Sequence, residues 1–194
     1  MSWPVTTKDA MLNGQTFTHA SAHTGYPGTT GANEVTGGAP AYARQAIVMN
    51  TSSGGIRALN AAAVFDVPAC TVRFFGYWNG STFVGYAANG GATPKNFVAT
   101  PATDLIILPS HGWSDGQKIT FVYGTAPGGL STGTVYFVRD QSTDSFKVAA
   151  TLGGVAMNIS SGASVGCFVV AITENVYASQ DTHTLASTNF VVPD

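Results

Sequence analysis

Apolar and polar residues alternate along most of the chain, and turn residues interrupt this alternation at short intervals. Short runs rich in Val, Phe, Tyr and Thr recur between clusters of Gly, Pro, Asn and Asp. This spacing is typical of short antiparallel strands. Only the segment from Thr6 to Gly14 has helical signals, with Asp9 in its first turn and a glycine to end it. The pattern therefore predicts an all-β fold.

The expected strands fall into two groups, which are separated by a segment rich in Gly, Ala, Thr and Pro at residues 88–103. Before this segment the strongest signal is Asn79-Gly80 between two apolar runs, which predicts a tight hairpin. After it, alternation in 118–123 predicts a half-buried strand whose inner face carries Ile119, Phe121 and Tyr123. The expected strands are 18–24, 44–49, 63–67, 71–77 and 83–88, then 104–108, 118–123, 134–139, 145–150, 155–159 and 164–173, with further short strands in 176–194.

Composition narrows the function classes. Charged residues make up 9 % of the 194-residue chain, whereas globular proteins carry roughly 25 %. Eight Lys and Arg residues cannot supply a strong phosphate footprint, so we expect no nucleic-acid partner. No run of about 18 apolar residues exists and the N-terminus lacks secretory-signal features, so we expect no membrane partner. A surface so poor in charge is typical of a chain packed against copies of itself or neighbouring proteins.

The longest motif lies near the N-terminus. The run THASAHTGYPGTTGANEVTGGAPAYARQAI, residues 18–47, resembles the N-terminal module of siphophage tail-fibre and minor-tail structural proteins. Residues 64–86 are similar to the next two strands of that family, and residues 177–194 to its closing strands. Between them, residues 111–159 resemble a small β module that recurs in phage virion proteins.

The resemblance implies a jelly-roll-like antiparallel β-sandwich as a virion-attachment domain, built from residues 1–98 plus 174–194. A second small β domain, residues 99–173, would be inserted near the C-terminal end of the first. The implied protein is a non-enzymatic bacteriophage virion structural protein, a minor tail or tail-fibre component that docks on the particle and projects a β module. Implied partners are other virion proteins and copies of the chain itself, for which a trimer is expected by analogy. The implied location is the virion, assembled in the host cytoplasm.

Two alternatives stay open. The chain has no repetitive shaft such as a fibre normally has, which favours a capsid decoration (cement) protein. The other alternative is a carbohydrate-binding module that contacts a glycan of the host surface. Its candidate binding residues are Tyr77, Trp78 and Trp113, because aromatic rings at exposed tips can stack on sugars or anchor a protein contact. For Tyr77 and Trp78, just before the Asn79-Gly80 turn, the competing interpretation is a core position at a strand end.

The histidines give no catalytic residue, metal site or cofactor. His19 and His23 have the spacing of helical zinc ligands, but their Thr, Gly and Pro neighbours favour a strand. A strand would hold the two side chains about 13 Å apart, too far to share a metal. His111 precedes a glycine in an expected turn, and the chain has no nucleophile-elbow motif to serve it.

The remaining candidates have ordinary structural interpretations. The run Asp140-x-Ser142-x-Asp144 resembles the start of a calcium loop but lacks its glycine and its distal glutamate, so a hairpin loop is expected. Cys70 and Cys167 permit one disulfide at most, and their apolar surroundings favour free buried thiols.

Overall fold

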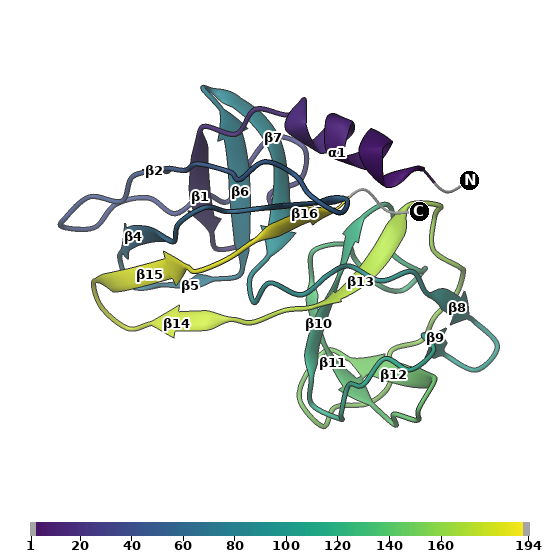
Figure 1. Cartoon of the computed structure of the whole chain (residues 1–194). Coiled ribbons are helices and arrows are strands. Elements are labelled where there is room, and N and C mark those ends of the chain that lie inside the picture. Colours follow the sequence, from purple (N-terminus) through teal and green to yellow (C-terminus); the bar gives the residue numbers. More distant parts are fainter. Residues whose placement is uncertain (1–2, 192–194) are drawn as a thin grey trace. The chain divides into compact units, whose positions relative to one another are not determined.

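A computed structural model describes residues 3–191 of the chain (Figure 1). Within this range the chain forms one helix and sixteen strands, and all the paired strands are antiparallel. The predicted all-β antiparallel fold is therefore confirmed. The chain divides into two compact units: unit 1 is Met1–Gly91 with Glu174–Asp194, and unit 2 is Ala92–Thr173.

Unit 1 contains a four-stranded sheet with the order β2-β1-β6-β7. Its strands are β1 (His19–His23), β2 (Gln45–Ala46), β6 (Phe74–Asn79) and β7 (Thr82–Ala88). The β6–β7 hairpin turns at Gly80-Ser81, with Asn79 paired to Thr82. The hairpin predicted from Asn79-Gly80 is confirmed, and the expected strand 44–49 shrinks to the two residues of β2.

Three two-stranded antiparallel sheets follow one another as a ribbon, which packs against this four-stranded sheet. One side of the ribbon consists of β3 (Ile56–Ala58), β4 (Ala63–Val67) and β5 (Cys70–Val72), and the other of β14 (Asn175–Tyr177), β15 (Asp181–Leu185) and β16 (Asn189–Val191). Its register runs from Val72 opposite Asn175 to Ile56 opposite Val191. The segment after unit 2 thus pairs with the segment before unit 2, and both are needed to complete the sandwich.

Strand alternation decides which side chains fill the core of unit 1. Phe75 and Tyr77 of β6 point toward the ribbon, where Phe75 meets Phe65 with ring centroids 6.0 Å apart. This core also includes Ala20, Ala22, Val35, Ile47, Leu59, Ala63, Val67, Val72 and Leu185. The intervening residues of β1 and β6 point to the opposite face of the sheet, where the loop between β1 and β2 covers them.

The points where the chain leaves and rejoins unit 1 lie side by side. Asn89 Nδ2 donates to Asn175 Oδ1 at 2.7 Å. Arg73, at the corner between β5 and β6, forms an ion pair with Glu174 at 2.5 Å and donates to the carbonyl of Thr24 at 2.7 Å. These contacts tie the returning segment to the first half of unit 1.

Unit 2 is a six-stranded sheet with the order β13-β10-β11-β12-β9-β8. Its strands are β8 (Val98–Thr100), β9 (Leu105–Ile107), β10 (Lys118–Tyr123), β11 (Val135–Arg139), β12 (Ser145–Ala149) and β13 (Cys167–Ala171). Its own core contains Ile106, Phe121, Tyr136 and Phe146, among other residues. Residues 140–144 connect β11 to β12, so the expected hairpin loop is confirmed there.

Two expectations for unit 2 differ from the structure. Segment 155–159 is not a strand: Ala156 makes only an isolated bridge, to Ala149. Strand β10 is not half-buried, because Thr120 and Val122 are buried as well, whereas Tyr123 is exposed and has a φ of 71°. Alternation separates the two faces of a strand but does not reveal whether the second face is covered.

The boundary between the units falls at Gly91, whereas the family resemblance implies a first domain that extends to residue 98. Segment 92–97 belongs to unit 2, where Lys95 exchanges backbone hydrogen bonds of 2.8 and 3.0 Å with Val169. The Ala, Thr and Pro of this segment carry no strand signal, and neither this bridge nor β8 was expected.

The helix α1 (Val5–Asn13) starts after Pro4 without a side-chain cap and ends at Gly14. It docks through Asp9, whose carboxylate accepts from Ser52 Oγ at 2.6 Å and from the Gly55 amide at 2.9 Å. No helix within the described residues is long and apolar enough to cross a membrane.

Candidate functional site

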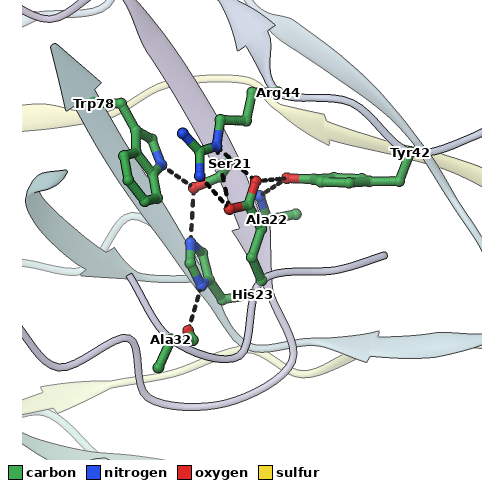
Figure 2. Close-up of polar contacts among 8 residues, drawn as sticks. Ser21, Ala22, His23, Ala32, Tyr42, Arg44 and Trp78 are labelled. Atoms are coloured by element: carbon green, nitrogen blue, oxygen red, sulfur yellow. Dashed lines mark hydrogen bonds and ion pairs between the residues drawn. The ribbon is translucent and has the colours of Figure 1, made fainter. Parts of the chain in front are cut away.

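A cluster of polar side chains lies between the four-stranded sheet and the loop that follows β1 (Figure 2); Ser21, His23 and Trp78 are buried, and the other members are half-buried. Its members come from β1, β6 and the loop between β1 and β2. We call it the polar cluster, and it consists of Ser21, His23, Glu34, Tyr42, Arg44 and Trp78.

Half of the polar cluster is a linear chain of hydrogen bonds. Trp78 Nε1 donates to Ser21 Oγ at 2.7 Å, and Ser21 Oγ lies 2.7 Å from His23 Nε2. His23 Nδ1 lies 2.7 Å from the carbonyl oxygen of Ala32, so this nitrogen carries the proton. His23 Nε2 then accepts from Ser21, and one neutral tautomer satisfies every group in the chain. These hydrogen bonds connect β6, through β1, to Ala32 in the loop between β1 and β2.

The other half of the polar cluster fixes the base of the loop. The Arg44 guanidinium donates to both carboxylate oxygens of Glu34, the shortest contact being 2.7 Å. The Tyr42 hydroxyl donates to Glu34 Oε1 at 3.3 Å and accepts from the Ala22 amide at 2.8 Å. Burial raises the pKa of Tyr42, and the hydrogen bonds to Glu34 raise that of Arg44. Both groups therefore keep their protons.

The two halves meet at the indole of Trp78. The guanidinium carbon of Arg44 lies 3.3 Å from the Trp78 ring centroid, within the range of a cation–π contact. The same ring donates its N–H to Ser21, so Arg44 covers it from the loop side while Ser21 binds it from the sheet. This contact couples the ion pair at the base of the loop to the hydrogen-bond chain of His23.

The Ser21–His23 pair has the contact distance of a nucleophile and its general base. Both side chains are fully buried, however, and β6 blocks the space beside them. A Cβ added at Gly76 would lie 2.5 Å from both Ser21 Oγ and His23 Nε2. No reacting atom fits next to Ser21, and its lone pairs already receive the indole N–H of Trp78. The arrangement suits the fixing of a loop rather than acyl transfer.

Tyr77 and Trp78 are not exposed at the hairpin tip, so in this structure neither can stack on a sugar. They are consecutive in β6 and point to opposite faces. Tyr77 is in the core of unit 1 and its hydroxyl donates to Thr188 Oγ1 at 2.8 Å. Trp78 is buried against Phe83, with ring centroids 4.9 Å apart. The core interpretation applies to both, because the strand continues to Asn79 and keeps the two rings inside.

Trp113, the third candidate, lies in unit 2 and is half-buried. Its ring packs on Phe146 at 5.5 Å, and the ammonium of Lys95 lies 5.8 Å from its centroid. The neighbouring His111 is buried; its Nε2 donates to the carbonyl of Ser142 at 2.8 Å, and its Nδ1 accepts from the Trp113 amide. His111 thus links the hairpin loop 140–144 to the backbone of Trp113.

His19 and His23 both lie on β1, as the strand interpretation expected. Among the described residues, no group of three or more His, Cys, Asp or Glu side chains is placed to hold a metal ion. Cys70 and Cys167 are free thiols, as predicted; Cys167 is buried, whereas Cys70 is only half-buried. Burial raises the pKa of Cys167 to about 11, so this thiol is protonated at neutral pH.

A pocket of about 210 Å³ opens in unit 1 beside the end of β7. Residues 87–91 and 184–188 form its walls, and Phe75 and Tyr77 contribute to its floor. None of its lining residues is charged, and none is a histidine or cysteine. The pocket is therefore lined by neutral side chains only.

The sequence signals for five members of the polar cluster were missed, although the motif at 18–47 contains all five. For His23 the sequence predicts only an ordinary polar position on a strand, in place of a metal ligand. The usable signal is that Ser21 and His23 are two residues apart on a strand and so share a face. The contacts with Glu34, Tyr42 and Arg44 depend on how a long loop folds back, which alternation does not encode.

In comparisons with known proteins, the chain matches no family model, no curated protein and no solved structure.

Gly76→Ala tests whether close packing around the Ser21–His23 pair stabilises unit 1. The new methyl group must push both side chains aside, so we expect the free energy of unfolding to fall by roughly 1–3 kcal/mol or more. The matched control is Gly85→Ala on the neighbouring strand, where an added Cβ meets nothing within 4 Å. Urea unfolding of both variants measures the difference. Equal midpoints would contradict the packing described here.

Acidification should destabilise unit 1 through two buried histidines. Burial lowers the pKa of His23 and that of His183, whose Nδ1 contacts the Tyr177 hydroxyl at 2.6 Å. Near pH 6.5 the two imidazoles therefore bind protons in the unfolded chain but not in the folded chain. The free energy of unfolding falls as the pH drops below that value. The slope is at most about 1.4 kcal/mol per pH unit for each histidine.

Urea midpoints at pH 7.5, 6.0 and 5.0 measure this dependence. His23→Gln and His183→Gln, which cannot titrate, should each flatten it. A midpoint that is constant or rises on acidification would show that these imidazoles are not buried in the neutral form.

Proposed function

We propose that this chain is a non-enzymatic bacteriophage virion structural protein of the minor-tail or tail-fibre type. Unit 1 docks on other virion proteins, and unit 2 is the β module that the particle projects. The chain is assembled in the host cytoplasm and works in the virion beside copies of itself. The resemblance of residues 18–47 to siphophage tail proteins gives the class of protein, and the geometry of the same residues supports a docking role.

The observation that carries the proposal is where the side chains of the motif at residues 18–47 lie in the structure. Five of its polar side chains form the polar cluster together with Trp78, while residues 36–41 of the loop between them are exposed. A binding loop that is ordered before it meets its partner loses less conformational entropy on association. A catalytic loop needs an accessible reactive group, and the Ser21–His23 pair is closed off by β6. The motif therefore supports adhesion and not catalysis.

The alternatives differ in their support. A capsid decoration protein would use the same rigid loop, and the chain's lack of a shaft repeat favours it. The carbohydrate-binding alternative is weaker, because Tyr77 and Trp78 present no ring face to solvent. Trp113 is half-buried and already packs on Phe146.

Immunogold electron microscopy of intact particles tests the proposal. Antibodies against the purified chain should label the tail end of the phage, and excess free chain should abolish this labelling as a control. Label spread over the head would replace the tail assignment by the decoration role. No label on any particle would overturn the structural role and turn attention to glycan binding.

A further inference from the structure

The dipeptide Asn-Gly occurs three times in the chain, as Asn13-Gly14, Asn79-Gly80 and Asn89-Gly90. Asparagine before glycine deamidates spontaneously, because glycine has no side chain to hinder attack of its backbone nitrogen on the side-chain carbonyl of the asparagine. The local chemistry is the same at all three pairs. The fold therefore decides which pair reacts in the native protein.

The side chain of Asn89 is held inside unit 1. Asn89 is 6 % exposed, and its Nδ2 donates to Asn175 Oδ1 at 2.7 Å and to the Val72 carbonyl at 3.3 Å. Attack on its side-chain carbonyl would remove the donor of both hydrogen bonds at a buried site, which costs free energy. We therefore expect Asn89 to be protected in the folded chain.

Asn13 is exposed, but both of its reacting groups are held. Its Oδ1 accepts from the Ser52 amide at 2.8 Å. The Gly14 amide, which would supply the attacking nitrogen, donates to the Ala10 carbonyl at 3.0 Å in the last turn of α1. Ring closure must rotate the peptide that follows Asn13 and so break both hydrogen bonds. The intact helix therefore protects this pair.

Asn79 has the fewest restraints of the three asparagines. It ends β6, and Asn79, Gly80 and Ser81 are all exposed. Within residues 3–191 no hydrogen bond holds its side chain. A Cβ added at Gly80 would meet nothing within 4 Å, so the space around the attacking nitrogen is open. The exposed tip of a hairpin can also open locally while the rest of the unit stays folded.

One contact restrains the attacking nitrogen at this tip. The Gly80 amide donates to Thr18 Oγ1 at 2.8 Å, and Thr18 Oγ1 donates to the Trp78 carbonyl at 3.1 Å. The Gly80 nitrogen must leave this hydrogen bond before it can lose its proton and attack. A single hydrogen bond to a hydroxyl group at a solvent-exposed turn slows such a step but does not prevent it.

We propose that Asn79 is the site at which the folded chain deamidates, and that the hydroxyl of Thr18 limits the rate. The Gly80 nitrogen loses its proton to water and bonds to Cγ of Asn79. The bond from Cγ to the side-chain nitrogen breaks, and this nitrogen takes a proton from water and leaves as ammonia. Water then opens the five-membered imide ring to aspartate or isoaspartate.

The reaction changes the chemistry of the β6–β7 hairpin tip with time. Either product adds one negative charge to an exposed turn of a chain whose formal net charge is −2. Isoaspartate also lengthens the main chain directly after the buried Trp78. The reaction needs no partner, so it goes beyond the proposed virion role and does not depend on it.

Peptide mapping by mass spectrometry tests the site. The purified full-length chain is incubated at 37 °C and pH 8, and Asn13 and Asn89 serve as controls within the same molecule. Asn79 should deamidate at least ten times faster than either of them. In urea the three asparagines should react at similar rates, because the fold no longer distinguishes them. Equal rates in the folded chain, or a faster reaction at Asn13 or Asn89, would overturn the proposal.

Two variants test the part played by Thr18. Thr18→Val removes the hydroxyl and should raise the deamidation rate at Asn79 several-fold, with the rates at Asn13 and Asn89 unchanged. Thr18→Ser keeps a hydroxyl and should react at nearly the rate of the unaltered chain. An unchanged rate at Asn79 in Thr18→Val would overturn the role of Thr18. An equal rise at Asn89 would overturn it too, because it would show a general loosening of unit 1.

Discussion

The hydrogen bond from the buried imidazole of His23 to the carbonyl of Ala32 determines how the outer face of unit 1 is built. Strand β1 supplies the imidazole, and the loop that follows it supplies the carbonyl. Because His23 Nε2 is committed to Ser21, and Ser21 to Trp78, the loop is tied to two strands at once. The ion pair between Glu34 and Arg44 then closes the loop over the Trp78 indole. This network adds side-chain ties to the backbone hydrogen bonds that join the loop to β1, such as the one from the Val35 amide to the Ala22 carbonyl.

The chain has few charged residues, and many of them form hydrogen bonds or ion pairs with other parts of the same chain. The carboxylate of Asp104 accepts from the Ile159 amide at 2.7 Å, and that of Asp144 accepts from the Ser110 amide at 2.8 Å. Arg57 donates to the carbonyls of Leu12 and Gln15. Charged side chains, which in most proteins face solvent, here form hydrogen bonds that hold loops in place. Much of the surface therefore carries no charge. Such a surface suits a protein whose neighbours are other proteins.

Local sequence signals predicted the strands well, because side-chain alternation and turn residues are written into short segments. Strand 63–67 and the Asn79-Gly80 hairpin follow from such signals, and so does the hairpin loop 140–144. The ribbon does not, because it pairs residues 56–72 with residues 175–191 across the whole of unit 2. No short-range pattern encodes that register.

The candidate site was harder to predict, for a related reason. An aromatic residue before a turn can be exposed and bind a partner, or it can be the last core residue of a strand. Which of the two applies depends on how far the strand extends. For Trp78 the strand continues to Asn79 and the loop folds back over the ring. The Ser21–His23 spacing was visible in the sequence, but its role depends on the carbonyl of Ala32 and on the space left by Gly76. Both arise from tertiary structure.

Hydrogen exchange at the backbone amides of the loop tests most directly whether the polar cluster holds it in one shape. The Ala32 amide donates to the Pro27 carbonyl, the Val35 amide to Ala22, and the Tyr42 amide to Gly37. The account predicts that these three amides exchange slowly, at rates close to those of the strand amides, and that His23→Ala removes the protection. Exchange at the rate of an unstructured peptide in the unaltered chain would contradict it.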